Sequence, residues 1–162
     1  MKQRILILSF LLSLFWGGSI MAQTNPEVDK IFETYGKQKG AVLIELSTDI
    51  LAGHTQMKLY KSLTTASNDP LIAATTTAIE NDIEGGMKLI KTLKNGKVET
   101  GYYCLKKEDR SSMYEYILYK EKSKKMTLIY IRGNFSPQQL ERELGKLKDL
   151  FIYVNNKRIK LQ

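Results

Sequence analysis

Histidine and cysteine are almost missing from this sequence, which contains one residue of each type among 162. Zinc catalysis that uses several histidines and the His-Glu-x-x-His metalloprotease motif are therefore excluded. The glycine patterns of nucleotide-binding loops and the Gly-x-Ser-x-Gly motif of serine hydrolases do not occur. Since Cys104 is the single cysteine, no intrachain disulfide can form. We predict no cofactor and no metal.

The remaining candidates for catalysis are weak. Cys104 and His54 could form a nucleophile–base dyad, but no local signature surrounds either residue, so a buried, inert thiol is favoured for Cys104. Glu80, Asp82 and Glu84 have a spacing of two, but they lack the glycine and the twelfth-position glutamate of a calcium loop. We predict no catalytic residues. The alternative is a small periplasmic hydrolase-like enzyme with a site near Cys104 or His54.

Long hydrophobic runs are also missing, with one exception near the start. Residues 5–16 are apolar, follow Lys2 and Arg4, and precede the small residue Ala22, which is the pattern of a secretory signal peptide. This run is too short to span a membrane comfortably, so an uncleaved anchor is the less favoured alternative. We predict removal of residues 1–22, export to the periplasm or the exterior, no transmembrane anchor, and a soluble single domain over residues 23–162.

Acidic residues are fewer than basic ones, 17 against 25, which gives a formal net charge of +8. The lysines are spread over every expected element, and an exported protein rarely meets nucleic acid, so we predict no nucleic-acid partner. A solvated surface of mixed charge is the simplest explanation. An envelope protein or an anionic surface component is the expected kind of partner, and the sequence does not indicate an oligomeric state.

Three apolar, tyrosine-rich segments between Lys97 and Gly133 predict an antiparallel meander. Residues 98–105 and 113–120 alternate with period two, and residues 126–132 are the most apolar, as expected of a central strand. Residues 87–93 also alternate. Asn95-Gly96 then predicts a tight hairpin into the meander, because both residues tolerate positive φ. Four consecutive antiparallel strands are expected.

Helix signals lie on both sides of this meander. Asn25-Pro26 and Asp69-Pro70 each combine a cap with a proline, although three consecutive threonines leave a strand as the alternative for residues 70–82. Residues 41–46 predict a strand, and Ser47 a cap for a second helix that reaches about Leu63.

A capping box at Ser136 to Gln139 precedes the clearest amphipathic stripe in the chain. Charged residues such as Glu143 are expected off this stripe. Residues 151–161 predict a strand and an Asn155-Asn156 turn. The expected fold class is α+β, a single domain with a mainly antiparallel sheet and helices packed mostly on one face. The apolar positions of the stripe are Leu140, Leu144, Leu147, Leu150 and Phe151.

Tyrosines interleaved with lysines in the meander can serve as a stacking platform for a ligand. Ordinary sheet packing with phenol tips at the rim explains the same pattern. The candidate ligand-binding residues are Tyr102, Tyr114, Tyr116 and Tyr119.

Several short phrases give the chain a family resemblance. They are the Met-Ala-Gln around the expected cleavage site after Ala22, the segment Val28 to Ala41, Leu46-Ser47, and the Leu-Ile-Tyr-Ile-Arg-Gly that ends at Gly133. With these, the chain resembles the small exported proteins of unknown function found in Bacteroides and relatives. The resemblance implies an exported α+β domain and carries over no catalytic residue. The expected function is a non-enzymatic envelope binding or protein-interaction module.

Overall fold

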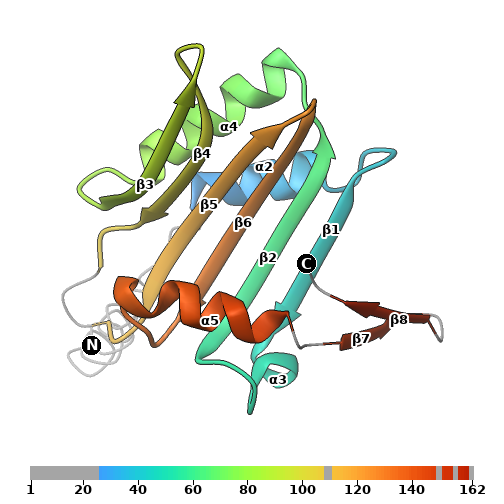
Figure 1. Ribbon diagram of the computed structural model, residues 1–162, viewed down its shortest axis with the longest axis vertical. Coiled ribbons are helices and arrows are strands. Elements are labelled where there is room, and N and C mark those ends of the chain that lie inside the picture. Colours follow the sequence, from blue (N-terminus) through green and yellow to red (C-terminus); the bar gives the residue numbers. More distant parts are fainter. Residues whose placement is uncertain (1–25, 108–110, 149–150, 155–156, 161–162) are drawn as a thin grey trace, which may run out of the picture.

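A computed structural model describes residues 26–107, 111–148, 151–154 and 157–160. Its centre is a six-stranded sheet with the order β1-β2-β6-β5-β4-β3, in which every neighbouring pair is antiparallel (Figure 1). This confirms the α+β class and the antiparallel sheet. The proposed signal peptide, residues 1–22, lies outside the described residues.

The elements follow one another in an order close to the predicted one. The helices are α2 (Glu27–Tyr35), α3 (Thr48–Leu51), α4 (Asp69–Asp82) and α5 (Leu140–Leu147), the last preceded by the 3-10 turn η2 (Pro137–Gln139). The strands of the main sheet are β1 (Val42–Ser47), β2 (Met57–Ala66), β3 (Met87–Lys94), β4 (Lys97–Cys104), β5 (Tyr114–Lys122) and β6 (Lys125–Gly133). A separate hairpin pairs β7 (Phe151–Val154) with β8 (Lys157–Lys160).

The predicted four-stranded meander is confirmed as β3 to β6. Asn95 and Gly96 take φ values of 52° and 75°, so the β3–β4 hairpin turns through two left-handed residues, as the Asn-Gly signal predicts. Ser123 and Lys124 do the same in the β5–β6 hairpin, with φ values of 55° and 59°. The most apolar strand, β6, lies in the interior of the sheet between β2 and β5.

The predicted helix that reaches Leu63 is wrong. Of residues 48–63, only the four residues of α3 are helical, and Gly53, with a φ of 81°, lies in the turn that follows. The chain then enters β2, which pairs with β1 on one side and β6 on the other. Met57, Tyr60 and Leu63 are spaced by three residues and so imitate a helical stripe, but a register shift between Met57 and Leu59 interrupts the alternation of this strand.

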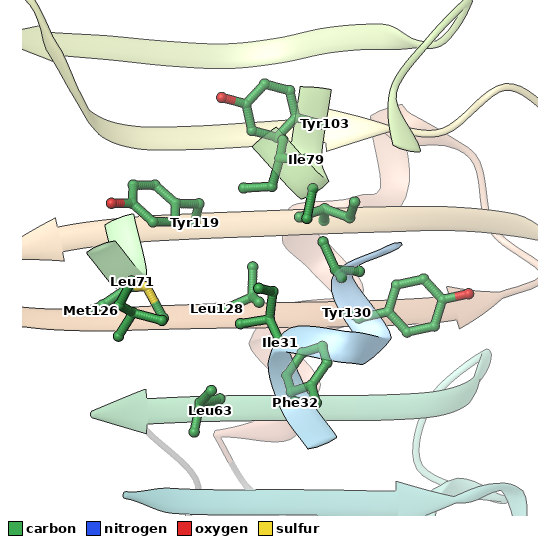
Figure 2. Close-up of a cluster of buried hydrophobic side chains, with 13 residues drawn as sticks. Ile31, Phe32, Leu63, Leu71, Ile79, Tyr103, Tyr119, Met126, Leu128 and Tyr130 are labelled. Carbon is green, nitrogen blue, oxygen red and sulfur yellow. The ribbon is translucent and has the colours of Figure 1, made fainter. Parts of the chain in front are cut away.

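The two longest helices, α2 and α4, lie on the same face of the sheet, which we call the α2/α4 face (Figure 1). Their apolar side chains, such as Phe32 and Ile79, pack on Leu63, Leu128 and Tyr119 from the strands (Figure 2). Most helical residues therefore lie on one face. Residues 70–82 are helical, and α4 is capped by Asn68 instead of the predicted Asp69: the Leu71 N–H donates to the Asn68 side chain at 2.9 Å.

The N-terminus of α2 is capped from a distant part of the chain. The carboxylate of Asp82, at the end of α4, accepts the backbone N–H groups of Glu27 at 2.6 Å and Val28 at 2.8 Å. Asn25, the predicted cap, lies outside the described residues. A carboxylate here satisfies two free N–H groups and complements the positive end of the helix dipole. Asp82 therefore joins α2 to α4.

The opposite face of the sheet, the α5 face, is crossed by α5 near one end of the strands (Figure 1). Leu140 and Leu147 are buried there against Tyr60, Tyr116 and Ile131. The Ser136 N–H donates to the Gln139 side chain at 2.9 Å, so the predicted capping box is present. Leu144 is only half-buried. The remainder of the α5 face is not covered by a helix within the described residues.

Candidate functional site

The four candidate tyrosines do not share one surface. Alternation along β5 turns Tyr114 and Tyr116 toward the α5 face and Tyr119 toward the α2/α4 face, while Tyr102 of β4 lies on the α5 face. Tyr119 is buried near Tyr103 and Ile79 (Figure 2), and burial, together with the charge of Glu121, raises its pKa to about 12. A single stacking platform of all four side chains is therefore not formed.

Tyr116 is a buried anchor for the segment that leads into α5. Its ring stacks on Phe135 with centroids 5.1 Å apart, and its hydroxyl donates to the Phe135 carbonyl at 2.5 Å. Burial raises the pKa of this phenol. Tyr114 stacks in turn on Tyr116 at 6.3 Å, and the ammonium of Lys107 lies 4.4 Å from the Tyr114 ring centre. These contacts describe core packing for Tyr116 and a partly open ring for Tyr114.

Tyr102 lines a groove between α5 and the open part of the α5 face, which we call the front groove. It has a volume of about 520 Å³. Tyr102, Leu118 and Ile129 are directly opposite one another on β4, β5 and β6, so they form one continuous apolar floor. The remaining lining residues are Tyr60, Glu141, Leu144, Gly145, Leu147 and Lys148.

A polar row borders the front groove on the side away from α5. The strand register aligns Thr64, Thr127, Lys120 and Thr100 across β2, β6, β5 and β4, and we call this set the threonine–lysine row. Thr64 and Thr127 form a hydroxyl–hydroxyl hydrogen bond at 3.3 Å. Beyond this row, Lys122 and Lys125 face each other across the β5–β6 hairpin. Along the strands, the α5 face thus passes from the apolar floor of the groove to a cationic surface within a few residues.

The helix α5, which forms one wall of the front groove, is held in place by Glu143, whose position was predicted wrongly from the sequence. Glu143 was expected off the apolar stripe of α5, but its side chain is 0% exposed. One carboxylate oxygen accepts the Gln56 backbone N–H at 2.9 Å, and the other accepts Lys146 Nζ at 2.8 Å. Arg142 Nε lies 3.6 Å away. Glu143 therefore ties α5 to the segment before β2.

The electrostatics of Glu143 favour its charged form. Burial alone acts to raise the pKa of this carboxyl group. The hydrogen bonds from Gln56 and Lys146 and the charges of Lys146 and Arg142 outweigh burial, so the pKa of Glu143 lies below its ordinary value. The sequence signal that could have identified this residue is its spacing of three from Leu140, which places it beside the buried stripe.

The two residues of the alternative catalytic site lie in different surroundings. Cys104 is buried in β4, its Sγ is 3.6 Å from the Leu105 carbonyl oxygen, and burial raises the pKa of its thiol. His54 is exposed in the turn after α3. Over residues 26–107, 111–148, 151–154 and 157–160, no cluster of three or more His, Cys, Asp or Glu side chains could hold a metal ion.

A second groove lies between α4 and the β3–β4 hairpin. It has a volume of about 600 Å³, and its lining includes Thr76 and Glu80 from α4 and Lys91 from β3. Lys97 and Asp69 form an ion pair of 3.5 Å beside it, and both side chains are largely exposed. Charged residues of both signs line each groove, but the front groove also has a floor of three side chains that are paired across neighbouring strands, so it is the better candidate for specific binding.

Fold and groove together define an α+β domain with a partly open sheet face. The chain belongs to a family of unknown function (DUF6108), which matches residues 15–144. No curated protein matches the chain. Within the described residues, every helix is too short or too polar to cross a membrane.

Proposed function

We propose that the protein is an exported, non-enzymatic binding module whose ligand or partner occupies the front groove. The observation that carries this proposal is the groove itself, which has an apolar floor on three paired strands and a volume of about 520 Å³. Ligand sites of proteins fall in this range of volumes and combine a mostly apolar lining with a few polar groups. Tyr102 is the one candidate tyrosine that lines the groove, and an envelope protein or an anionic envelope component is the expected partner.

The perturbed titratable groups near this face support binding over catalysis. The Cys104 thiol and the Tyr116 phenol have raised pKa values because they are buried, which disfavours the nucleophilic anions. The Glu143 carboxylate is engaged by Gln56 and Lys146. These groups stabilise the domain, and a hydrolase site near Cys104 or His54 gains no support from their geometry.

Blocking the groove at Gly145 tests the proposal. A side-chain carbon added at Gly145 meets no heavy atom within 4 Å, so the Cβ of a larger residue is accommodated there without a clash. Gly145 lines the front groove, so Gly145→Trp is expected to fill it. The neutral apolar dye Nile red should bind the wild-type protein with a blue-shifted emission, and Gly145→Trp should weaken this binding about tenfold, the equivalent of 1.4 kcal/mol.

The matched control is Thr34→Trp, an equally neutral change at an exposed position of α2 on the opposite face. This variant should bind the dye like the wild type. Urea unfolding of both variants shows whether the domain stays folded. Equal dye binding by all three folded proteins, or no binding by the wild type, overturns the proposed use of the front groove.

A further inference from the structure

The lysine side chains beside the front groove indicate which class of ligand it can bind. The floor residue Leu118 and the residues Lys120 and Lys122 follow one another at every second position of β5, so all three face the same side of the sheet. Each step of two residues along a strand covers about 7 Å. The ammonium groups of Lys120 and Lys122 lie one and two such steps from the floor residue Leu118. A molecule that lies on the apolar floor can therefore place one of its ends beside them.

The charges in these rows are of one sign. The threonine–lysine row and the row beyond it, which holds Ala66, Lys125 and Lys122, contain three lysines and no acidic residue. Glu121 lies between Lys120 and Lys122 in the chain but faces the other side of the sheet, where it accepts the Ser67 hydroxyl at 3.0 Å. The acidic residue that lines the groove, Glu141, lies on α5 at the opposite wall.

This arrangement costs stability in the absence of an anion. Lys122 and Lys125 are direct cross-strand partners, and like charges at such positions repel each other. Both side chains are exposed, and so is Lys120. An anionic group between them would remove the repulsion, and the hydroxyls of Thr64, Thr100 and Thr127 could donate hydrogen bonds to its oxygen atoms.

We propose that the front groove binds a fatty acid, with the acyl chain on the floor of Tyr102, Leu118 and Ile129 and the carboxylate at Lys120, Lys122 and Lys125. This inference rests on the proposed function and names its ligand class. The apolar lining accounts for the chain, and the lysines account for the carboxylate. A neutral ligand leaves the lysines uncompensated, and a cationic one is repelled by them.

Displacement of Nile red by three ligands of equal chain length tests the inference. The ligands are dodecanoate, dodecanol and dodecyltrimethylammonium, the two ions used below their micelle-forming concentrations and the alcohol below its solubility limit. Dodecanoate should displace the dye at a concentration about tenfold lower than dodecanol, and the cation should be the weakest. Added salt should reduce the advantage of dodecanoate, because the lysines are exposed.

The variant Lys120→Gln/Lys122→Gln/Lys125→Gln should lose the preference for dodecanoate and keep the affinity for dodecanol. A matched control removes the same charge elsewhere, in Lys37→Gln/Lys39→Gln/Lys58→Gln, at three exposed positions outside these rows, and should retain the preference. Equal displacement by all three ligands, or a preference that survives the first variant, overturns the fatty-acid inference while the groove remains a binding site. Failure of Nile red and all three ligands to bind overturns the proposed function as well.

Discussion

Glu143→Ala is the sharpest test of how α5 is held on the sheet. The change removes a fully buried carboxylate, together with its hydrogen bonds to the Gln56 N–H and to Lys146. The Gln56 N–H then loses its acceptor. Because Glu143 joins α5 to the segment before β2, the effect should exceed that of an ordinary surface substitution.

The expected loss follows from the two interactions. A hydrogen bond from a backbone N–H to a buried carboxylate contributes about 1.5–3 kcal/mol. The Lys146 side chain is 38% exposed, so its ion pair, three residues along the helix, is screened and adds only about 0.2–0.5 kcal/mol. The free energy of unfolding should therefore fall by about 2–3 kcal/mol at neutral pH, a large share of a typical domain's total.

The pH dependence gives this prediction a second, independent readout. The pKa of Glu143 is lowered in the folded state, so the unfolded chain binds a proton at this position more readily than the folded protein does. The stabilisation is thus fully present above the unfolded-state pKa, near 4.3, and is lost as the pH falls through the folded-state value. The difference between wild type and Glu143→Ala should be largest near pH 7 and should shrink below about pH 4.

Urea unfolding at several pH values measures both effects. Glu141→Ala, two residues earlier on the same helix and exposed, is the control and should change stability by no more than about 0.5 kcal/mol. Equal midpoints for the two variants at pH 7 would show that the buried carboxylate does not hold α5. A difference that does not vary with pH would refute the electrostatic explanation.

Three further outcomes are expected. Asp82→Ala should destabilise the protein by about 0.5–2 kcal/mol in urea unfolding because α2 loses its cap, whereas the exposed Glu84→Ala should have little effect; equal losses would contradict the capping role. Cys104 should react slowly with a thiol reagent in the native state and rapidly in urea, because it is buried and its thiol pKa is raised; rapid stoichiometric labelling of the folded protein would contradict this. Expressed with its own N-terminus in a related bacterium, the mature protein should begin at or near Gln23 in the soluble fraction, and an intact mass that retains residues 1–22 in a membrane pellet would refute export.

Local sequence signals were sufficient for the meander. The Asn95-Gly96 turn, the period-two alternation and the capping box at Ser136 each act within a few residues, and the structure has all three. The alternation of residues 98–105 also predicts Val98, Tyr102 and Cys104 on one face of β4 and Tyr103 on the other. Tyr102, Cys104 and Tyr103 lie as predicted, but Val98 packs with Tyr103, because a register shift against β3 interrupts the alternation between Val98 and Thr100. Such features depend on backbone preferences that neighbouring elements do not change.

Features that depend on residues far apart in the sequence could not be predicted from local signals. β2 is covered on both faces, so Tyr60 and Leu63 are buried on opposite sides and no simple alternation marks the strand. Glutamate is usually found at the surface, but Glu143 is buried, and the backbone N–H of Gln56, which is distant in sequence, donates to its carboxylate. The front groove likewise depends on where α5 crosses the sheet, which no periodicity specifies.

The pairing of β2 with β6 affects how the chain folds. β2 ends at Ala66 and β6 begins at Lys125, so this seam closes only after a long stretch of chain has been organised. The meander can assemble earlier from local hairpins, but β6 is then its outermost strand, with a free edge on an apolar sequence. Such an edge can pair with another chain. Folding yield should therefore fall with increasing protein concentration, and substitutions that slow the docking of β2 should promote aggregation even where the final structure is unchanged.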